Sequence, residues 1–401
     1  MPINKAVLAA FKAATRLRPD IREFYKTQRL AEDVSAKLVL PNPRCRIDEA
    51  FATMPDGFEV PLRVFTPLDF DFSLAEGLKV SEDSRGTVLF FHGGGWVNGT
   101  VDFYIDACTT MAIQLERRVV SVDYRRAPEH RFPQAAEDCY EVARQLYAGT
   151  LLEDVDPENV VLFGDSAGGN LAAVLSLMAR DRGDFQPRTQ MLLYPVTYND
   201  HDPFTSWFDS VRENGEDYLL TWRDIEGYMD LYRSAPADFD DPYFAPLLDP
   251  DLSRQPRTLV ISAEYCPLRD EGEAYAARLE LEGDQEVQCY RMLDAVHGYL
   301  LYPSVLSLVK DTYRIIKHFL DGDDLTQEGE PAWLGNLVPT RQRRQVLLVP
   351  GGQLGPDGVP LRSHHARRCG SRCAAACPRE DGRRLPQLQR LPAQRHVLAL
   401  P

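Results

Sequence analysis

The surroundings of Ser166 are the clearest indication of chemistry in this sequence. The residue stands in Gly-Asp-Ser-Ala-Gly-Gly-Asn (164–170), which follows the apolar run 159–163 and opens a helical stretch. Gly-x-Ser-x-Gly between a strand and a helix is typical of a sharp turn that exposes the serine hydroxyl at the carboxyl edge of a sheet. Without this context the pattern would equally describe a glycine-rich packing turn. We therefore predict that Ser166 is a nucleophile.

A second group of residues could stabilise the charge that such a nucleophile creates. The stretch His-Gly-Gly-Gly-Trp (92–96) leaves an earlier apolar run. Consecutive glycines allow backbone N–H groups to point together at a developing oxyanion, which acyl transfer requires. We assign this role to the N–H groups of Gly93 and Gly94, with Ala167 as the third donor. We expect His92 to shape this loop rather than act as a base.

His297 is the candidate general base. It lies in Asp-Ala-Val-His-Gly-Tyr-Leu (294–300), after the last predicted strand and before the final predicted helix. Imidazole can accept the serine proton near neutral pH and later return it to a leaving group. The order of serine before histidine agrees with that of α/β-hydrolases, whereas we expect His130 and His318 to be structural.

The elements that must position these residues follow an alternating pattern. Short apolar strands are separated by helical stretches, which indicates a mostly parallel sheet covered on both faces. Two helices open the chain, and a hairpin of two alternating runs follows them. A long aromatic and acidic interval then interrupts the alternation of strands and helices, and we expect it to be an insertion over the sheet. The predicted strands are 86–92, 118–124, 159–165, 189–196, 257–263 and 286–292, the hairpin is 44–67, the opening helices are 6–17 and 21–34, and the insertion is 200–246.

These motifs together resemble the hormone-sensitive-lipase-like family of α/β-hydrolases, the bacterial esterase and acetyl-esterase relatives. The matching segments are 92–96, 122–138, 164–170, 267–279 and 297–299, in the order that the family has them. The resemblance implies an α/β-hydrolase domain over 41–325, a helical cap built from 1–40 and 200–246, a small-molecule ester substrate and no cofactor. It also allows a homodimer.

One residue departs from the family pattern. The family has Asp-Pro-Leu where this chain has Cys-Pro-Leu, so Cys266 occupies the position of the acid that orients the histidine. A thiol is mostly neutral at pH 7 and accepts hydrogen bonds weakly. We expect Asp270 or Asp200 to substitute for the acid, with Glu264 ranked behind them.

Two hypotheses of function are compatible with a cysteine at position 266. The first is a serine carboxylesterase that forms an acyl-enzyme and is slowed by the cysteine. The second is a small-molecule binding protein that keeps the hydrolase fold without turnover. The retention of Ser166, the glycine loop and His297 favours the esterase.

Composition excludes other classes of protein. The formal charge of −15 disfavours nucleic acid as a partner, and no apolar run is long enough for a membrane span or a signal peptide, so we expect a cytoplasmic protein. Residues 341–401 differ, with 12 Arg, no Lys and no aromatic residue. We expect 326–401 to be a disordered basic tail, and the spacing of Cys369, Cys373 and Cys377 fits no zinc pattern, so we expect no metal.

Overall fold

The computed structural model describes residues 5–16, 18–40, 42–70, 78–80, 86–322 and 337–339. All of these belong to one compact unit, which spans residues 1–347. Almost all of the predicted basic tail, 326–401, and its three cysteines lie outside the described residues. In these ranges no helix combines the length and the apolar character needed to cross a bilayer.

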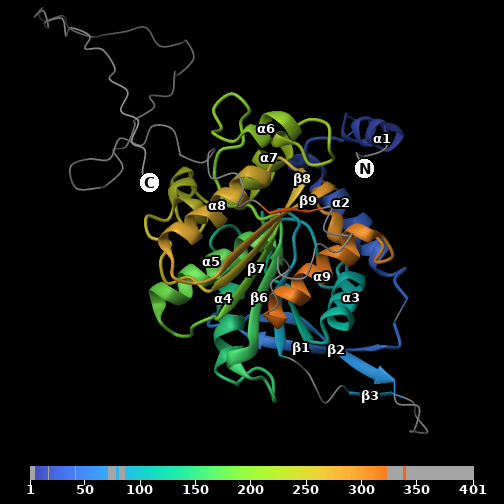
Figure 1. The fold of residues 1–401 in the computed structure, drawn as a ribbon, viewed down its shortest axis with the longest axis vertical. Helices are drawn as coiled ribbons and strands as arrows, with labels where there is room; N and C mark the ends of the chain where they lie inside the picture. Colours follow the sequence, from blue (N-terminus) through green and yellow to red (C-terminus); the bar gives the residue numbers. More distant parts are fainter. Residues whose placement is uncertain are drawn as a thin grey trace, which may run out of the picture. The chain divides into compact units, whose positions relative to one another are not determined.

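Ten strands of the described residues form one sheet in the order β1-β2-β5-β4-β6-β7-β8-β9-β10, with β3 pairing with β2 (Figure 1). The bounds are β1 Cys45–Thr53, β2 Glu59–Phe70, β3 Leu78–Val80, β4 Thr87–Phe91, β5 Arg118–Val122, β6 Val160–Asp165, β7 Thr189–Leu193, β8 Arg257–Tyr265, β9 Val287–Val296 and β10 Leu337–Pro339. The strands from β5 to β9 are parallel, and the β1–β2 hairpin joins β5 antiparallel. The predicted α/β-hydrolase sheet with its leading hairpin is thus confirmed.

The central strands are apolar because both faces of the sheet are covered. Every residue of β4 and of β6 is buried, as expected for parallel strands between two helical layers. Figure 1 shows α3 and α9 on one side of the sheet and α4, α5 and α8 on the other. These helices are α3 Ile105–Leu115, α4 Gln134–Tyr147, α5 Ala167–Arg182, α8 Arg269–Glu282 and α9 Ser307–Asp321.

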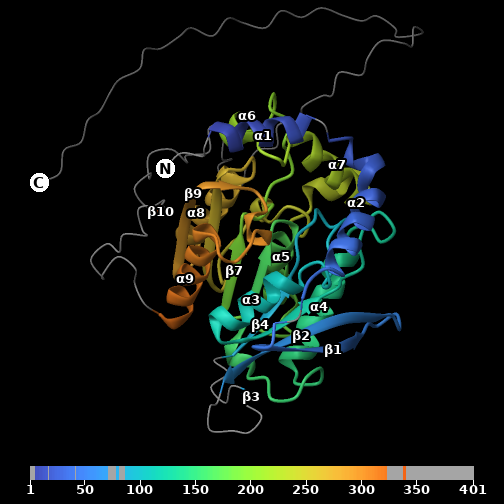
Figure 2. The same ribbon diagram turned by 90° about the vertical axis from the view of Figure 1, so that its right-hand side faces the viewer.

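Four more helices gather near the carboxyl ends of the parallel strands (Figures 1 and 2). They are α1 Lys5–Arg16, α2 Ile21–Ala36, α6 Asp209–Asn214 and α7 Trp222–Tyr232. Ion pairs join the two N-terminal helices to the insertion: Lys12 Nζ lies 2.7 Å from the Asp217 carboxylate, and Arg22 Nη2 lies 2.6 Å from that of Asp230. Segments far apart in the sequence therefore form one layer.

The close contact between α5 and β4 gives a stability prediction. A Cβ on Gly168 would lie 1.9 Å from the Phe91 carbonyl oxygen, a backbone atom that cannot move aside. We expect Gly168→Ala to destabilise the protein by about 3 kcal/mol or more, because overpacking against backbone is not relieved by side-chain rotation. Chemical denaturation would measure this loss.

Gly272→Ala in α8 is the matched control. Its Cβ would lie 3.3 Å from the Pro195 ring, and alanine is the better helix former. We expect a change of about 1 kcal/mol or less, and equal losses in both variants would contradict the packing argument.

Candidate active site

Ser166 lies in the strained turn between β6 and α5. Its φ of +55° and ψ of −120° fall in a region that residues with a side chain rarely adopt. The turn is held by a hydrogen bond of 2.9 Å from the Ser166 N–H to the Leu193 carbonyl. A Cβ on Gly164 would lie 2.1 Å from the Gly168 carbonyl oxygen, so the flanking glycines are required by packing. The motif thus forms the strand–turn–helix predicted for it.

His297 reaches this serine from the loop after β9. Its Nε2 lies 2.9 Å from the Ser166 Oγ, within hydrogen-bonding distance. The imidazole packs against the Tyr194 ring, with centroids 4.7 Å apart. The two residues are 131 positions apart in the sequence, and the common edge of the parallel strands brings them together.

Cys266 lies on the other side of the imidazole, immediately after β8. Its Sγ is 3.1 Å from the His297 Nδ1 and accepts a hydrogen bond of 3.3 Å from the Leu268 N–H. The side chain is fully buried. A sulfur atom therefore occupies the place in which a carboxylate would orient the histidine.

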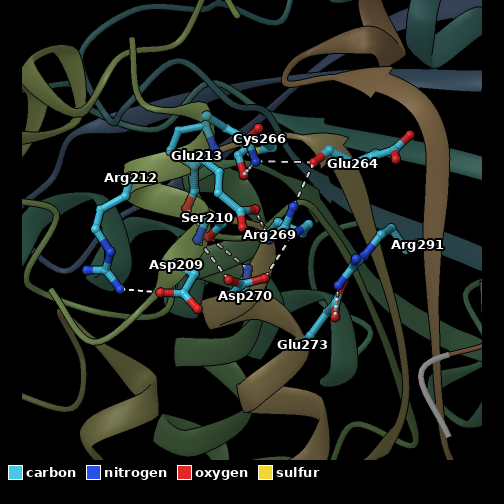
Figure 3. Close-up of polar contacts among 12 residues, drawn as sticks. Asp209, Ser210, Arg212, Glu213, Glu264, Cys266, Arg269, Asp270, Glu273 and Arg291 are labelled. Carbon is cyan, nitrogen blue, oxygen red and sulfur yellow. Dashed lines mark hydrogen bonds and ion pairs between the residues drawn. The ribbon is translucent and has the colours of Figure 1, made fainter. Parts of the chain in front are cut away.

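Asp270 does not substitute for this acid, and that expectation requires correction. Its carboxylate accepts a hydrogen bond of 2.8 Å from the Ser210 N–H and one of 2.7 Å from the Arg269 Nε (Figure 3). The Arg269 guanidinium holds the pKa of this carboxyl below its usual range against the opposing effect of burial. Asp270 thus ties the start of α8 to Ser210 of α6.

The other two carboxylates considered are also engaged elsewhere. Glu264 Oε2 accepts a hydrogen bond of 2.7 Å from the Asp294 N–H, and Asp200 Oδ1 accepts one of 3.0 Å from the Thr205 hydroxyl. The structure thus places Cys266, rather than either of these residues, against the imidazole.

Burial favours the neutral forms of both Cys266 and His297. Burial raises the pKa of the Cys266 thiol, and enclosure in protein lowers the pKa of the His297 imidazole to about 3. A carboxylate only accepts hydrogen bonds and so holds the proton on Nδ1, which leaves Nε2 free to act as the base. A neutral thiol can donate or accept, so it does not select this tautomer.

The glycine loop requires a second correction. The Gly93 N–H donates to the Asp165 Oδ1 at 2.8 Å and lies 3.1 Å from the Tyr104 hydroxyl oxygen. It is therefore not a free donor for an oxyanion. Asp165 is buried, and burial raises its pKa to about 7 against the opposing hydrogen bonds. The sequence motif contains this aspartate beside the serine, but only the fold shows that its side chain binds the loop.

Gly94 and Ala167 remain as predicted donors, and Gly95 is a further candidate in the same loop. Gly94 and Gly95 have φ of +114° and +62°, and a Cβ on Gly95 would lie 2.3 Å from the Tyr228 ring. Ala167 is the first residue of α5, where a backbone N–H has no partner within the helix. The run of three glycines in the sequence is the signal that could have pointed to Gly95 as well.

His92 shapes the loop, as expected. Its ring stacks on Tyr124 with centroids 4.3 Å apart, and its Nδ1 lies 2.8 Å from the Gly93 carbonyl oxygen. Burial lowers the pKa of His92 to about 3. This histidine therefore has a packing partner and a backbone contact.

A cavity of about 220 Å³ opens onto Ser166 and His297. Most of its wall is apolar and comes from the strand ends and the overlying helices, with polar groups from α2 and from the turn before it. The lining includes Phe103, Val196, Leu219, Leu220, Ile225, Tyr228, Leu268 and Leu301, together with Arg18, Gln28 and Glu32. In the described ranges no group of three or more His, Cys, Asp or Glu residues could hold a metal ion.

Comparisons with known proteins agree with this fold. A family model described as alpha/beta hydrolase fold matches residues 88–301. The chain is 32% identical over 284 residues to an arylesterase of Saccharolobus solfataricus, covering 70% of this chain and 86% of that protein. It is 33% identical over 265 residues to an ethyl acetate hydrolase of Pseudomonas putida, covering 66% and 78% respectively.

Solved structures are also similar. A hyperthermophilic esterase from the archaeon Pyrobaculum calidifontis has 31% sequence identity and a TM-score of 0.69, covering 80% of this chain and 99% of that chain. An arylesterase structure has 28% identity and a TM-score of 0.67, with coverage of 80% and 99%.

The neutral pair predicts an unusual dependence on pH. The imidazole accepts a proton only above its own pKa, and that pKa lies far below the ordinary value of 6.5. Any turnover should therefore keep its rate down to about pH 5. In Cys266→Asp a nearby carboxylate stabilises the imidazolium, so the loss of activity on the acid side should move upward by one pH unit or more.

The test is to measure kcat/KM against pH for the unaltered chain and for Cys266→Asp. Cys266→Ser is the control, because a hydroxyl is neutral and should leave the profile of the original chain in place. An acid limb near pH 6.5 in the unaltered chain would show that a charged group acts on His297 after all.

Proposed function

The chain belongs to the hormone-sensitive-lipase-like group of α/β-hydrolases, and from this premise we propose that it is a serine carboxylesterase that cleaves small acyl esters through an acyl-enzyme. The observation that carries the proposal is the 2.9 Å contact between His297 Nε2 and Ser166 Oγ, made by a serine in a strained turn. This is the relation of nucleophile and base that covalent acyl transfer requires.

In the first half of the reaction, Ser166 Oγ attacks the ester carbonyl and His297 Nε2 takes its proton. The carbonyl oxygen becomes negatively charged and receives hydrogen bonds from the N–H groups of Gly94, Gly95 and Ala167. His297 returns the proton to the alcohol, which leaves, and the acyl group stays on the serine. Water then attacks with the same base, and the carboxylic acid departs.

The size of the substrate is inferred from the cavity and from the relatives. About 220 Å³ of space beside Ser166 suits a short acyl group and a small alcohol. One similar protein is named for ethyl acetate and another for aryl esters. We assign a cap role to the N-terminal helices and the 200–246 insertion, because residues of both line this cavity.

Cys266 slows this reaction in our proposal. It can neither fix the histidine tautomer nor stabilise the imidazolium that forms when the serine loses its proton. Replacement of the acid in a serine protease triad lowers kcat by about 10⁴-fold. Residual catalysis then comes from the backbone donors and from substrate binding.

The same residue favours a second candidate function, a binding protein for small molecules that no longer turns them over. In that case the cavity would be retained while the relay is not. The strained geometry of Ser166 argues for the esterase, because a binding role gives no reason to hold a hydroxyl in a costly conformation against an imidazole.

The direct test is hydrolysis of p-nitrophenyl acetate and butyrate by the purified chain. We expect turnover by the unaltered protein and a loss of at least about 10³-fold in Ser166→Ala. A fluorophosphonate probe should label the unaltered chain and spare the variant. If both proteins are equally inert to the esters and to the probe, the binding protein is the better account.

Restoring the acid gives a separate prediction. We expect Cys266→Asp to raise kcat by at least about tenfold, because a carboxylate at this site accepts from both His297 Nδ1 and the Leu268 N–H. Cys266→Ser should give no comparable gain. An unchanged or lower kcat in Cys266→Asp would show that the sulfur does not limit the reaction.

A further inference from the structure

Two charged residues of the N-terminal helix α2 bind the loop that carries the oxyanion donors. We propose that Glu32, assisted by Arg29, is a positioning residue for this loop, so that α2 supports the chemistry as well as covering the cavity. The inference rests on the proposed esterase function for its effect on rate. The contact itself is a feature of the fold and can be measured separately.

Glu32 makes the more specific of the two contacts. Its Oε2 accepts a hydrogen bond of 2.9 Å from the Gly99 N–H, and its Oε1 accepts one of 3.1 Å from Gln28 of the same helix. The residue is 8% exposed. A carboxylate is costly to bury and is retained only where its oxygens are satisfied, so the glycine amide is a substantial part of what holds Glu32 in place.

Arg29 binds the same loop one turn earlier on α2. Its Nε donates to the Val97 carbonyl at 2.8 Å, and its Nη2 donates to the Ala127 carbonyl at 2.6 Å. Residues three apart lie on the same face of a helix. A donor and an acceptor on one face of α2 therefore engage a carbonyl and an amide two residues apart in the loop.

Gly99 is the point at which the loop closes on its own beginning. Its φ is +82°, and a Cβ there would lie 2.5 Å from the Gly93 carbonyl oxygen and 2.6 Å from His92 Nδ1. Its carbonyl accepts a hydrogen bond of 2.7 Å from Arg126. Glu32 thus binds the N–H group of Gly99, and Arg126 binds its carbonyl group.

The candidate donors Gly94 and Gly95 belong to the loop that Gly93 and Gly99 close. The Gly94 carbonyl accepts from the Val97 and Asn98 N–H groups at 3.1 and 2.8 Å, so the segment from Gly94 to Asn98 forms one compact turn. A shift of Gly99 is therefore transmitted to the N–H groups of Gly94 and Gly95. Such donors stabilise the transition state only when they are correctly aimed, and loss of one lowers kcat by about 10²- to 10³-fold.

The experiment compares Glu32→Ala with Glu32→Gln and Asp33→Ala. Glu32→Ala removes the acceptor for the Gly99 N–H, whereas Glu32→Gln keeps an oxygen at the same reach. Asp33 is an exposed carboxylate one position along α2 and provides the matched control. For each folded variant, kcat and KM for p-nitrophenyl acetate and the hydrogen exchange of residues 92–99 would be measured.

We expect kcat of Glu32→Ala to fall at least about tenfold, with KM within about twofold and faster exchange at Gly99. Glu32→Gln should recover most of the rate, and Asp33→Ala should match the unaltered chain. A purely structural role would lower thermal stability without this separation of kcat from KM. If Glu32→Ala does not fold, Arg29→Met removes the adjacent bonds and is measured in the same way.

An unchanged kcat, or unchanged exchange in the loop, overturns the proposal. If the unaltered chain hydrolyses no ester while Glu32→Ala still loosens the loop, the esterase function fails and the coupling of α2 to the loop is supported. If the unaltered chain hydrolyses no ester and loop exchange is unchanged in Glu32→Ala, both proposals fail.

Discussion

The Ser166–His297 hydrogen bond is the interaction on which the proposed function of this molecule depends. It requires two loops from different parts of the chain to meet within 2.9 Å. Parallel strands make this possible, because the carboxyl ends of β6 and β9 lie along one edge of the sheet. The serine is kept there by a strained turn whose glycines pack against neighbouring backbone, so part of the folding free energy maintains the geometry of the site.

The residue next to His297 Nδ1 is where we expect this chain to differ from its family. The site has the shape of a triad but carries no charge at the third position, since burial favours the neutral thiol of Cys266. The site therefore keeps the arrangement of a triad without the negative charge that a carboxylate would place beside His297. The proposed nucleophile and base are in contact, whereas the position next to His297 Nδ1 is taken by the Cys266 sulfur.

Buried hydrogen bonds from two other carboxylates hold the glycine loop of the site in place. Asp165 fixes the start of the glycine loop through Gly93, and Glu32 of α2 binds its end through Gly99. Two carboxylates that take no part in proton transfer thus hold the loop from opposite sides. Their burial is tolerated because each is paired with backbone N–H groups that would otherwise lack partners.

The sequence alone determined the sheet and its leading hairpin, and it singled out Ser166, His297 and Cys266 as the residues of the candidate site. Local patterns carry those features: apolar runs with a repeating period, glycines around a turn, and the order of motifs along the chain.

The sequence did not determine which side chain faces His297, or which glycine N–H is free. Asp270 is four residues from Cys266, yet the start of α8 turns it toward Ser210. Gly93 looks equivalent to Gly95 in the sequence, yet Asp165 binds only the first. Both outcomes depend on the direction of side chains brought together from distant segments, and tertiary packing alone sets that direction.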